Sequence, residues 1–158
     1  MSRPCGLNVT LAEWHLVRGS ADDAWNCAEA AYTIANNTRF VIMIPAGLVM
    51  MGAAALMKPD IESARRCFDE AKGYLDSPKA NPWTKAFFQL HSGRFLLADK
   101  DIAKAASQFL HAVSLGSELK SQEYVGLGLY GMAQTHQADG RYQDADESVS
   151  QAVFVRII

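Results

Sequence analysis

The chain lacks an excess of charge of either sign. Its 158 residues include 15 Lys and Arg against 17 Asp and Glu, which leaves a formal net charge of −2 at pH 7. Arg65 and Arg66 form the only adjacent cationic pair. Because direct binding of DNA or RNA needs clustered Lys and Arg to neutralise phosphates, the sequence predicts no direct nucleic-acid partner.

Cysteine is also scarce. Cys5, Cys27 and Cys67 are odd in number, and none of them is spaced as CxxC. This pattern argues against a disulfide framework and a zinc site, and it favours a reducing compartment. The N-terminal residues contain no apolar leader run, so we expect a cytoplasmic protein without a signal peptide.

What the sequence does contain is a repeat of small residues. An alanine recurs at intervals of 40, 41 and 40 residues, with a second alanine seven residues later and an alanine or glycine twelve residues earlier. The three sets are Ala24, Ala64, Ala105 and Ala145; Ala31, Ala71, Ala112 and Ala152; and Ala12, Gly52, Gly93 and Ala133. Small residues at fixed offsets let helices approach closely, and a period near 40 predicts a stacked array of helix pairs.

Each repeat reads as a helix A, a tight turn and a helix B. The turns are expected at residues 18–20, 58–60, 99–101 and 139–141, where Ser20, Asp60 and Asp101 can cap the following helix. In helix B the alanine is flanked at i−3, i+4 and i+7 by mostly apolar residues, which predicts one buried stripe against helix A. Breaks between repeats are expected at 36–37, 76–78 and 116–117, with helix A over 7–18, 38–57, 82–98 and 120–138.

The pattern resembles the tetratricopeptide repeat. The family's small residue of helix A matches Ala12, Gly52, Gly93 and Ala133, and its helix B signature matches Ala64-Phe68-Ala71 and Ala105-Phe109-Ala112. The resemblance implies an all-α, right-handed α-solenoid of about four antiparallel helix pairs. It covers 1–158 as a single domain, with repeats at about 1–36, 37–77, 78–117 and 118–158. The long period is similar to that of sensor regions in large bacterial ATPase-type transcription activators.

Two segments suggest other functions. Residues 40–57 contain no charge and reach the lower limit of membrane-spanning length, but the repeat register places them in a buried helix A. Residues 126–131 spell GxGxxG, a dinucleotide fingerprint only when it joins a strand to a helix. The register places it inside the fourth helix A, where glycines favour close packing, so we expect no nucleotide cofactor and no membrane association.

No catalytic or metal-ligating set stands out. His15, His91, His111 and His136 lack paired ligand spacing, and the acidic residues cluster at turns, where they complement helix dipoles. We therefore expect no catalytic residues, no metal and no cofactor. An enzyme using these His and Asp residues remains a minor alternative.

The resemblance also implies where a partner would bind, because helices A of tetratricopeptide arrays line a concave groove. The groove positions transferred to this chain are Val49, Leu56, Phe87, Leu90, Arg94, Leu97, Tyr130 and Gln134. Most are apolar, which predicts a hydrophobic peptide or an amphipathic helix as the guest. We therefore expect a non-catalytic protein-interaction scaffold. The alternative is a ligand-sensing segment of a larger bacterial transcription regulator.

The last helix ends in an apolar run without a polar capping helix. Solenoids need a solvated end, so we expect either a fragment of a longer array or a homodimer formed through this helix. The residues predicted to self-associate are Val153, Phe154, Ile157 and Ile158.

Overall fold

The computed structural model describes residues 4–157, with side chains through Val155, and helices joined by turns and loops are the regular secondary structure of this part of the chain. The prediction of an all-α protein is confirmed for these residues. The helices are α1 (Cys5–Val17), α2 (Ala21–Asn37), α3 (Ile44–Met57), α4 (Ile61–Leu75), α5 (Pro82–Ala98), α6 (Ile102–Glu118), α7 (Gln122–Ala138) and α8 (Tyr142–Ile157).

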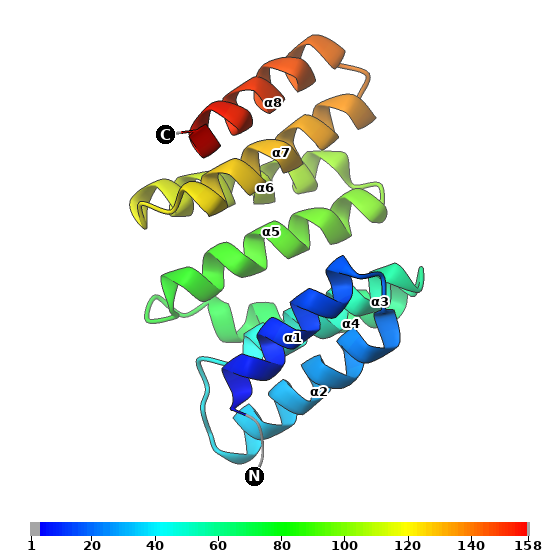
Figure 1. Cartoon of the computed structure of the whole chain (residues 1–158), viewed down its shortest axis with the longest axis vertical. Coiled ribbons are helices and arrows are strands. Elements are labelled where there is room, and N and C mark those ends of the chain that lie inside the picture. The colour runs from blue at the N-terminus through cyan, green and yellow to red at the C-terminus, as the bar shows by residue number, and fades with distance from the viewer. Residues whose placement is uncertain (1–3, 158) are drawn as a thin grey trace. The chain divides into compact units, whose positions relative to one another are not determined.

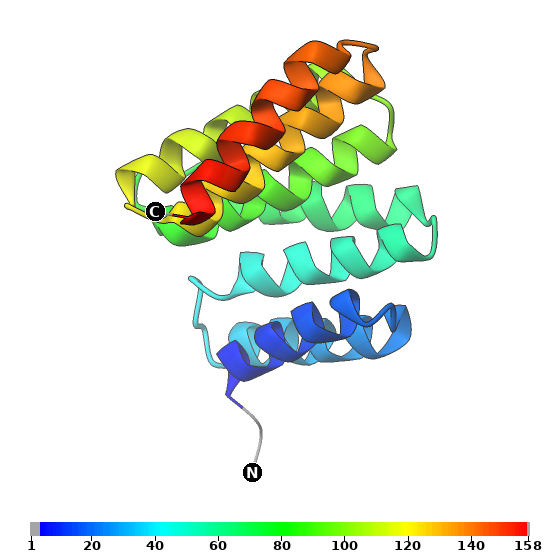
Figure 2. The ribbon, with the colours of Figure 1, turned by 45° about the horizontal axis from the view of Figure 1, so that its top comes forward.

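The chain divides into two compact units, Met1–Thr84 and Lys85–Ile158. In the first unit α1 packs on α2, α2 on α3, and α3 on α4 (Figure 1). In the second unit α6 packs on α7 and α7 on α8, as Figure 2 also shows. The hydroxyl of Ser92 in α5 donates a hydrogen bond to the side chain of Gln108 in α6 over 3.2 Å. Successive helices therefore pack as neighbours within each unit.

The repeated small residues form the helix contacts. All twelve positions of the three sets are buried, and Ala12, Ala24, Ala64 and Ala105 have no exposed surface. A Cβ atom at Gly52 would lie 2.8 Å from the ring of Phe68, and one at Gly93 would lie 2.8 Å from the ring of Phe109. Because real Cβ atoms do not approach so closely, these helix pairs require glycine at the contact. The expectation that the repeated small residues allow close helix contacts is confirmed at Gly52 and Gly93.

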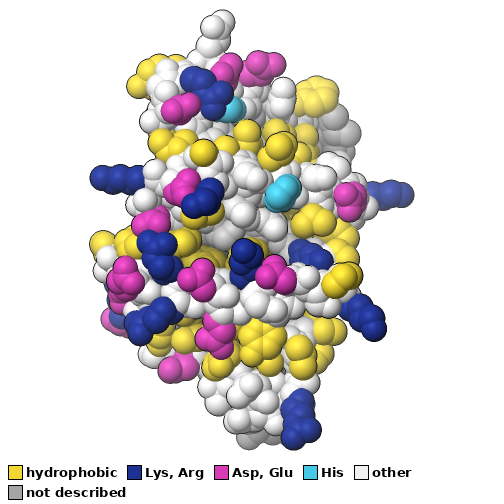
Figure 3. All heavy atoms as spheres, turned by 180° about the vertical axis from the view of Figure 1, so that it is seen from behind, with side chains coloured by type: hydrophobic (Ala, Val, Ile, Leu, Met, Phe, Trp, Pro, Cys, Tyr) yellow, Lys and Arg dark blue, Asp and Glu magenta, His cyan; other side chains and the backbone are white. Residues whose placement is uncertain are grey.

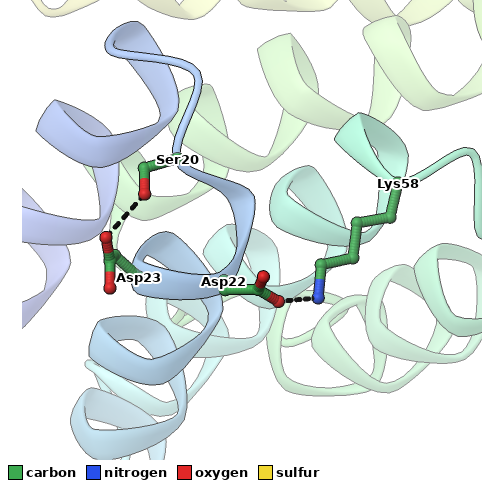
Figure 4. Close-up of polar contacts among 4 residues, drawn as sticks. All are labelled: Ser20, Asp22, Asp23 and Lys58. Atoms are coloured by element: carbon green, nitrogen blue, oxygen red, sulfur yellow. Dashed lines mark hydrogen bonds and ion pairs between the residues drawn. The ribbon is translucent and has the colours of Figure 1, made fainter.

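The four tight turns lie where the sequence predicts them. Gly19 and Gly140 adopt φ values of 79° and 75°, a left-handed conformation that glycine adopts without steric cost. Asp60 and Asp101 cap α4 and α6 by accepting hydrogen bonds from backbone N–H groups. The prediction that Ser20 caps α2 is wrong, because its hydroxyl donates to the Asp23 carboxylate over 2.6 Å instead (Figure 4).

The third helix is shorter than predicted. It begins at Ile44 rather than near residue 38, while Phe40, Val41 and Ile42 precede it and are half-exposed. Pro45 explains the start, because proline lacks an N–H and fits best in the first turn of a helix. From Ile44 to Met50 every residue is buried. None of the described helices is long and apolar enough to cross a membrane.

The sixth helix continues past its predicted end. Gly116 and Ser117 were expected to separate two repeats, but α6 runs on to Glu118. Gly116 instead allows a close approach, because a Cβ atom there would lie 2.8 Å from the backbone nitrogen of Val125 in α7. Gly116 is therefore a packing residue inside α6 and does not end the helix.

The predicted buried stripe is incomplete in α8. Ala145 and Ala152 are buried, whereas Tyr142 is 66% exposed and Val149 is 40% exposed. Phe109, the counterpart of Val149 in α6, is covered by the following helix α7 as well as by its own repeat. No described helix follows α8, so the stripe there is only half covered.

The glycines of α7 provide a matched test of close packing. A Cβ atom at Gly131 would lie 2.2 Å from the Phe109 ring, whereas one at Gly126 meets only the Ala152 carbonyl at 3.8 Å. We expect Gly131→Ala to lower the free energy of unfolding by about 1–3 kcal/mol through overpacking. Gly126→Ala should raise it by up to about 1 kcal/mol through helix propensity. Urea denaturation measures both, and equal effects would contradict the packing argument.

The cap of α6 predicts a pH dependence of stability. The ammonium group and the backbone N–H of Lys104 hydrogen-bond the Asp101 carboxylate and hold its pKa below the usual 3.8. A carboxylate with a depressed folded pKa stabilises the protein above its unfolded pKa, and this contribution disappears as the pH falls through the folded pKa. Asp101→Asn keeps a side-chain oxygen that can accept the hydrogen bonds, but the amide does not titrate. The melting temperature of this variant should therefore fall less than that of the wild type between pH 7 and pH 3. The exposed Asp69, which lies within α4, supplies the control variant Asp69→Asn, which should follow the wild type.

Candidate interaction groove

An open groove runs between α7 and α8 in the second unit. It has a volume of about 340 Å³ and is lined by Gly126, Leu127, Tyr130, Val149, Ala152 and Val153. Tyr130 and Val153 are 53% and 52% exposed. Every lining side chain except the tyrosine hydroxyl is apolar, so the groove suits an apolar guest.

A second recess continues the groove toward the start of α8. Its volume is about 210 Å³, and it shares Tyr130 and Val149 with the first. Gln134 and Gln137 of α7 and Asp146 of α8 also line it. The combined surface therefore has an apolar part near the middle of α7 and a polar part near the turn that precedes α8.

The local sequence explains why these side chains line the groove. Gly128 and Gly131 lie on the side of α7 that faces α6, where a Cβ atom would collide with Val113 or Phe109. Tyr130 is exposed between them in sequence and lies in the groove. The buried Ala145 and Ala152 bring α8 close to α7, which forms the floor of the groove.

The structure places two of the predicted groove residues, Tyr130 and Gln134, in this surface. In α5, Arg94 is exposed, Phe87 and Leu97 are partly buried, and Leu90 is only 3% exposed. In the first unit, Leu56 is partly buried and Val49 has no exposed surface. Val49 and Leu90 are therefore core side chains in this structure, and a shared binding role of the whole set stays a prediction.

The residues predicted to self-associate lie at the end of α8. Val153 and Phe154 are 52% and 64% exposed, so both side chains are accessible. Ile158 and the side chain of Ile157 lie outside the described residues. Whether this end pairs two chains stays a prediction.

The sequence reasoning missed the α8 side of the groove. Val149 was assigned to a buried stripe, and Gly126 and Ala152 were interpreted only as packing positions. Comparison of equivalent positions in the repeats could have identified this side of the groove. Val149 corresponds to Ala28 and Phe109, both of which are buried, and α7 covers Phe109, whereas no described helix follows α8.

The glycine-rich segment is not a phosphate-binding loop. Gly126, Gly128 and Gly131 all lie inside α7 and all are buried. Backbone N–H groups in the middle of a helix already bond within the helix and cannot hold a phosphate. This part of the sequence interpretation is confirmed.

The titratable side chains are dispersed. Among the described residues, no group of three or more His, Cys, Asp or Glu side chains could hold a metal ion. His15 lies 3.9 Å from the Asp23 carboxylate, and His111 is exposed. Burial raises the pKa of the Cys67 thiol to about 11, which keeps it protonated and unreactive.

Charged side chains of both signs are mixed on one face of the molecule. On the face shown in Figure 3, Lys and Arg side chains are interspersed with Asp and Glu. Dispersed opposite charges do not produce the continuous basic field that phosphate backbones require. This agrees with the balanced composition of the sequence.

Comparison with known proteins adds no identification. No protein-family model matches the chain, and no curated protein matches it. The resemblance to tetratricopeptide repeats, the scaffold function and the regulatory alternative therefore stay predictions.

His91 in α5 gives a prediction for acid stability. It is 6% exposed, and its ring meets that of Phe87 edge-on with centroids 4.7 Å apart. Burial and the nearby Arg94 lower the His91 pKa from 6.5 to about 3, so the folded protein holds the neutral form. As the pH falls below 6.5, His91 becomes protonated in the unfolded chain but stays neutral in the folded chain. Stability should fall by at most about 2 kcal/mol by pH 5 from this group.

His91→Gln should abolish that part of the pH dependence, because the amide is polar and does not titrate. The measurement is the free energy of unfolding in urea at pH 7.5 and pH 5 for both proteins. His111→Gln, at an exposed site in α6, is the control and should keep the wild-type slope. An unchanged slope in His91→Gln would contradict a buried neutral imidazole.

Proposed function

We propose that this chain is a non-catalytic interaction module that binds an amphipathic or hydrophobic helix in the groove between α7 and α8. We also propose that its helices form a tetratricopeptide-like, right-handed solenoid of about four antiparallel pairs. Support for the solenoid comes from the four tight turns at the repeat period and from the burial of every repeated small residue.

The observation that carries the binding function is the exposed apolar groove. Tyr130, Val149 and Val153 are each at least 40% exposed and lie together around a volume of about 340 Å³. Contiguous apolar surface of this kind is unfavourable in water and marks interaction sites. Helix-in-groove recognition uses such a surface, with apolar side chains of the guest inserted at helical spacing.

The groove also suggests how a guest is oriented. Burial of apolar side chains would supply most of the binding energy, at roughly 25 cal/mol per Å². The Tyr130 hydroxyl and the Gln134 amide can hydrogen-bond the polar edge of the guest, and Asp146 favours a cationic group at one end. An aromatic side chain at the centre with a polar rim is the usual composition of binding hot spots.

The test is selection of helical peptides on the immobilised chain. A displayed library of amphipathic helices is panned on the wild type, and the affinities of the selected peptides are measured by fluorescence anisotropy. We expect dissociation constants near the micromolar range, about −8 kcal/mol. Val149→Glu places a charge in the groove and should weaken binding at least roughly tenfold, since an unpaired charge is costly to desolvate.

Ser150→Glu is the matched control, because Ser150 is the exposed neighbour of Val149 and does not line the groove. It adds the same charge to α8 and should leave the affinities unchanged. Failure to select any helical peptide, or equal sensitivity to the two variants, would show that the groove is not a helix-binding site.

A further inference from the structure

An apolar stripe on α1 faces solvent. Leu7, Thr10, Trp14 and Val17 are spaced i, i+3, i+7 and i+10, which places them on one face of the helix. Leu7 is 46% exposed, Trp14 50% and Val17 84%. Three large apolar side chains on one exposed face are costly in water unless another surface covers them.

The counterparts of Leu7, Thr10 and Trp14 in other repeats are buried, whereas those of Val17 are exposed. Leu7 corresponds in the repeat register to Gly47 in α3 and Gly128 in α7, and both glycines are buried. A Cβ atom at Gly47 would lie 2.8 Å from the Tyr32 backbone in α2, and one at Gly128 would lie 2.7 Å from the Val113 side chain in α6. This face is therefore the one with which α3 and α7 each pack on the helix that precedes it.

The groove side of α8 lacks the complementary cover. Val149 and Val153 correspond to Phe109 and Val113 in α6, which lie under Gly128 and Gly131 of α7. Phe109 is 1% exposed, whereas Val149 and Val153 are 40% and 52% exposed. The exposed surface of α8 is therefore the counterpart of the α6 surface on which α7 packs.

We propose that α1 of a second copy of this chain occupies the α7–α8 groove, so that copies stack head to tail. The inference rests on the proposed function, because it names the helix that the groove binds. The packing that α3 makes on α2, and that α7 makes on α6, is repeated between two molecules.

The sizes of the facing side chains agree with this arrangement. In the second unit a large residue, Phe109, faces Gly131. In the first unit the same two register positions hold a small Ala28 and a large Met50, and both are fully buried. Between copies they would be Val149 and Thr10, two side chains of intermediate size. A large side chain opposite a small one fills the same volume between two helices as a pair of medium-sized side chains does.

The charges agree as well. Lys58, which follows α3, pairs with Asp22 in the first turn of α2 (Figure 4). Arg18 holds the register position of Lys58, and its guanidinium lies 4.6 Å from the ring centroid of Trp14 on the exposed stripe. In α8 the register position of Asp22 holds Gln143. Acidic groups nevertheless lie close by in Asp144, which is 3.7 Å from Arg141, and in the exposed Asp146. Stacking would bring the cation at the end of α1 to the acidic start of α8, which sets the direction of the guest helix.

The interface would be heterologous, because it joins two different surfaces of the same chain. Each added copy leaves one free α1 stripe and one free groove, so assembly is open-ended unless the stack closes into a ring. A symmetric dimer through α8 would instead stop at two chains.

The test uses two variants that each block one surface. Leu7→Glu places a charge in the α1 stripe and leaves the groove intact. Val149→Glu places a charge in the groove and leaves the α1 stripe intact. Sedimentation velocity of the full chain over a roughly hundredfold range of concentration should show mass that rises beyond two chains, because association follows mass action. Each variant alone should stay monomeric, and an equimolar mixture should form a species of two chains that does not grow.

The controls Gly6→Glu and Ser150→Glu place the same charge on exposed neighbours in α1 and α8 and should assemble like the wild type. Circular dichroism checks that all four variants fold. Head-to-tail stacking would be overturned if the wild type stays monomeric. It would also be overturned if Leu7→Glu forms dimers while Val149→Glu does not. If selected helical peptides still bind in a Val149-dependent way, the proposed function survives without this occupant. If they do not, both proposals fail.

Discussion

The close approach of neighbouring helices is the constraint on which the rest of this structure depends. Phe109 illustrates it, because its ring lies against both Gly93 of α5 and Gly131 of α7. One buried aromatic side chain thereby joins three helices of the second unit. Such contacts need glycine or alanine at fixed positions, and this requirement produces the repeat in the sequence.

The same constraint explains where apolar surface is left over. A helix in this arrangement has one face for its own partner and another for the helix of the next repeat. Interior helices such as α3 use both faces and are buried along most of their length. α1 and α8 each lack one neighbour among the described residues, and their exposed apolar side chains lie on the faces that such a neighbour would cover. The groove is thus a product of the architecture rather than an addition to it.

The sequence predicted the helical class, the turn positions and the buried alanines because these depend on local chemistry and on a pattern that occurs four times along the chain. Helix ends were less accurate, since Pro45 determines the start of α3 and Gly116 is a packing residue inside α6. The binding surface was only partly predicted. Tyr130 and Gln134 were assigned by register, but Val49 and Leu90 are buried, because a register gives the face of a helix without giving its neighbours.

The apolar composition of α3 affects the synthesis of the protein. Every residue from Ile44 to Met50 is buried, and α3 carries no charged side chain, so this helix has no polar face of its own. During synthesis it leaves the ribosome before α4, which covers one side of it. Until residues up to Leu75 have emerged, the nascent chain exposes a long apolar segment of the kind that chaperones bind. The time needed to translate α4 therefore determines how long the nascent chain is at risk of aggregation.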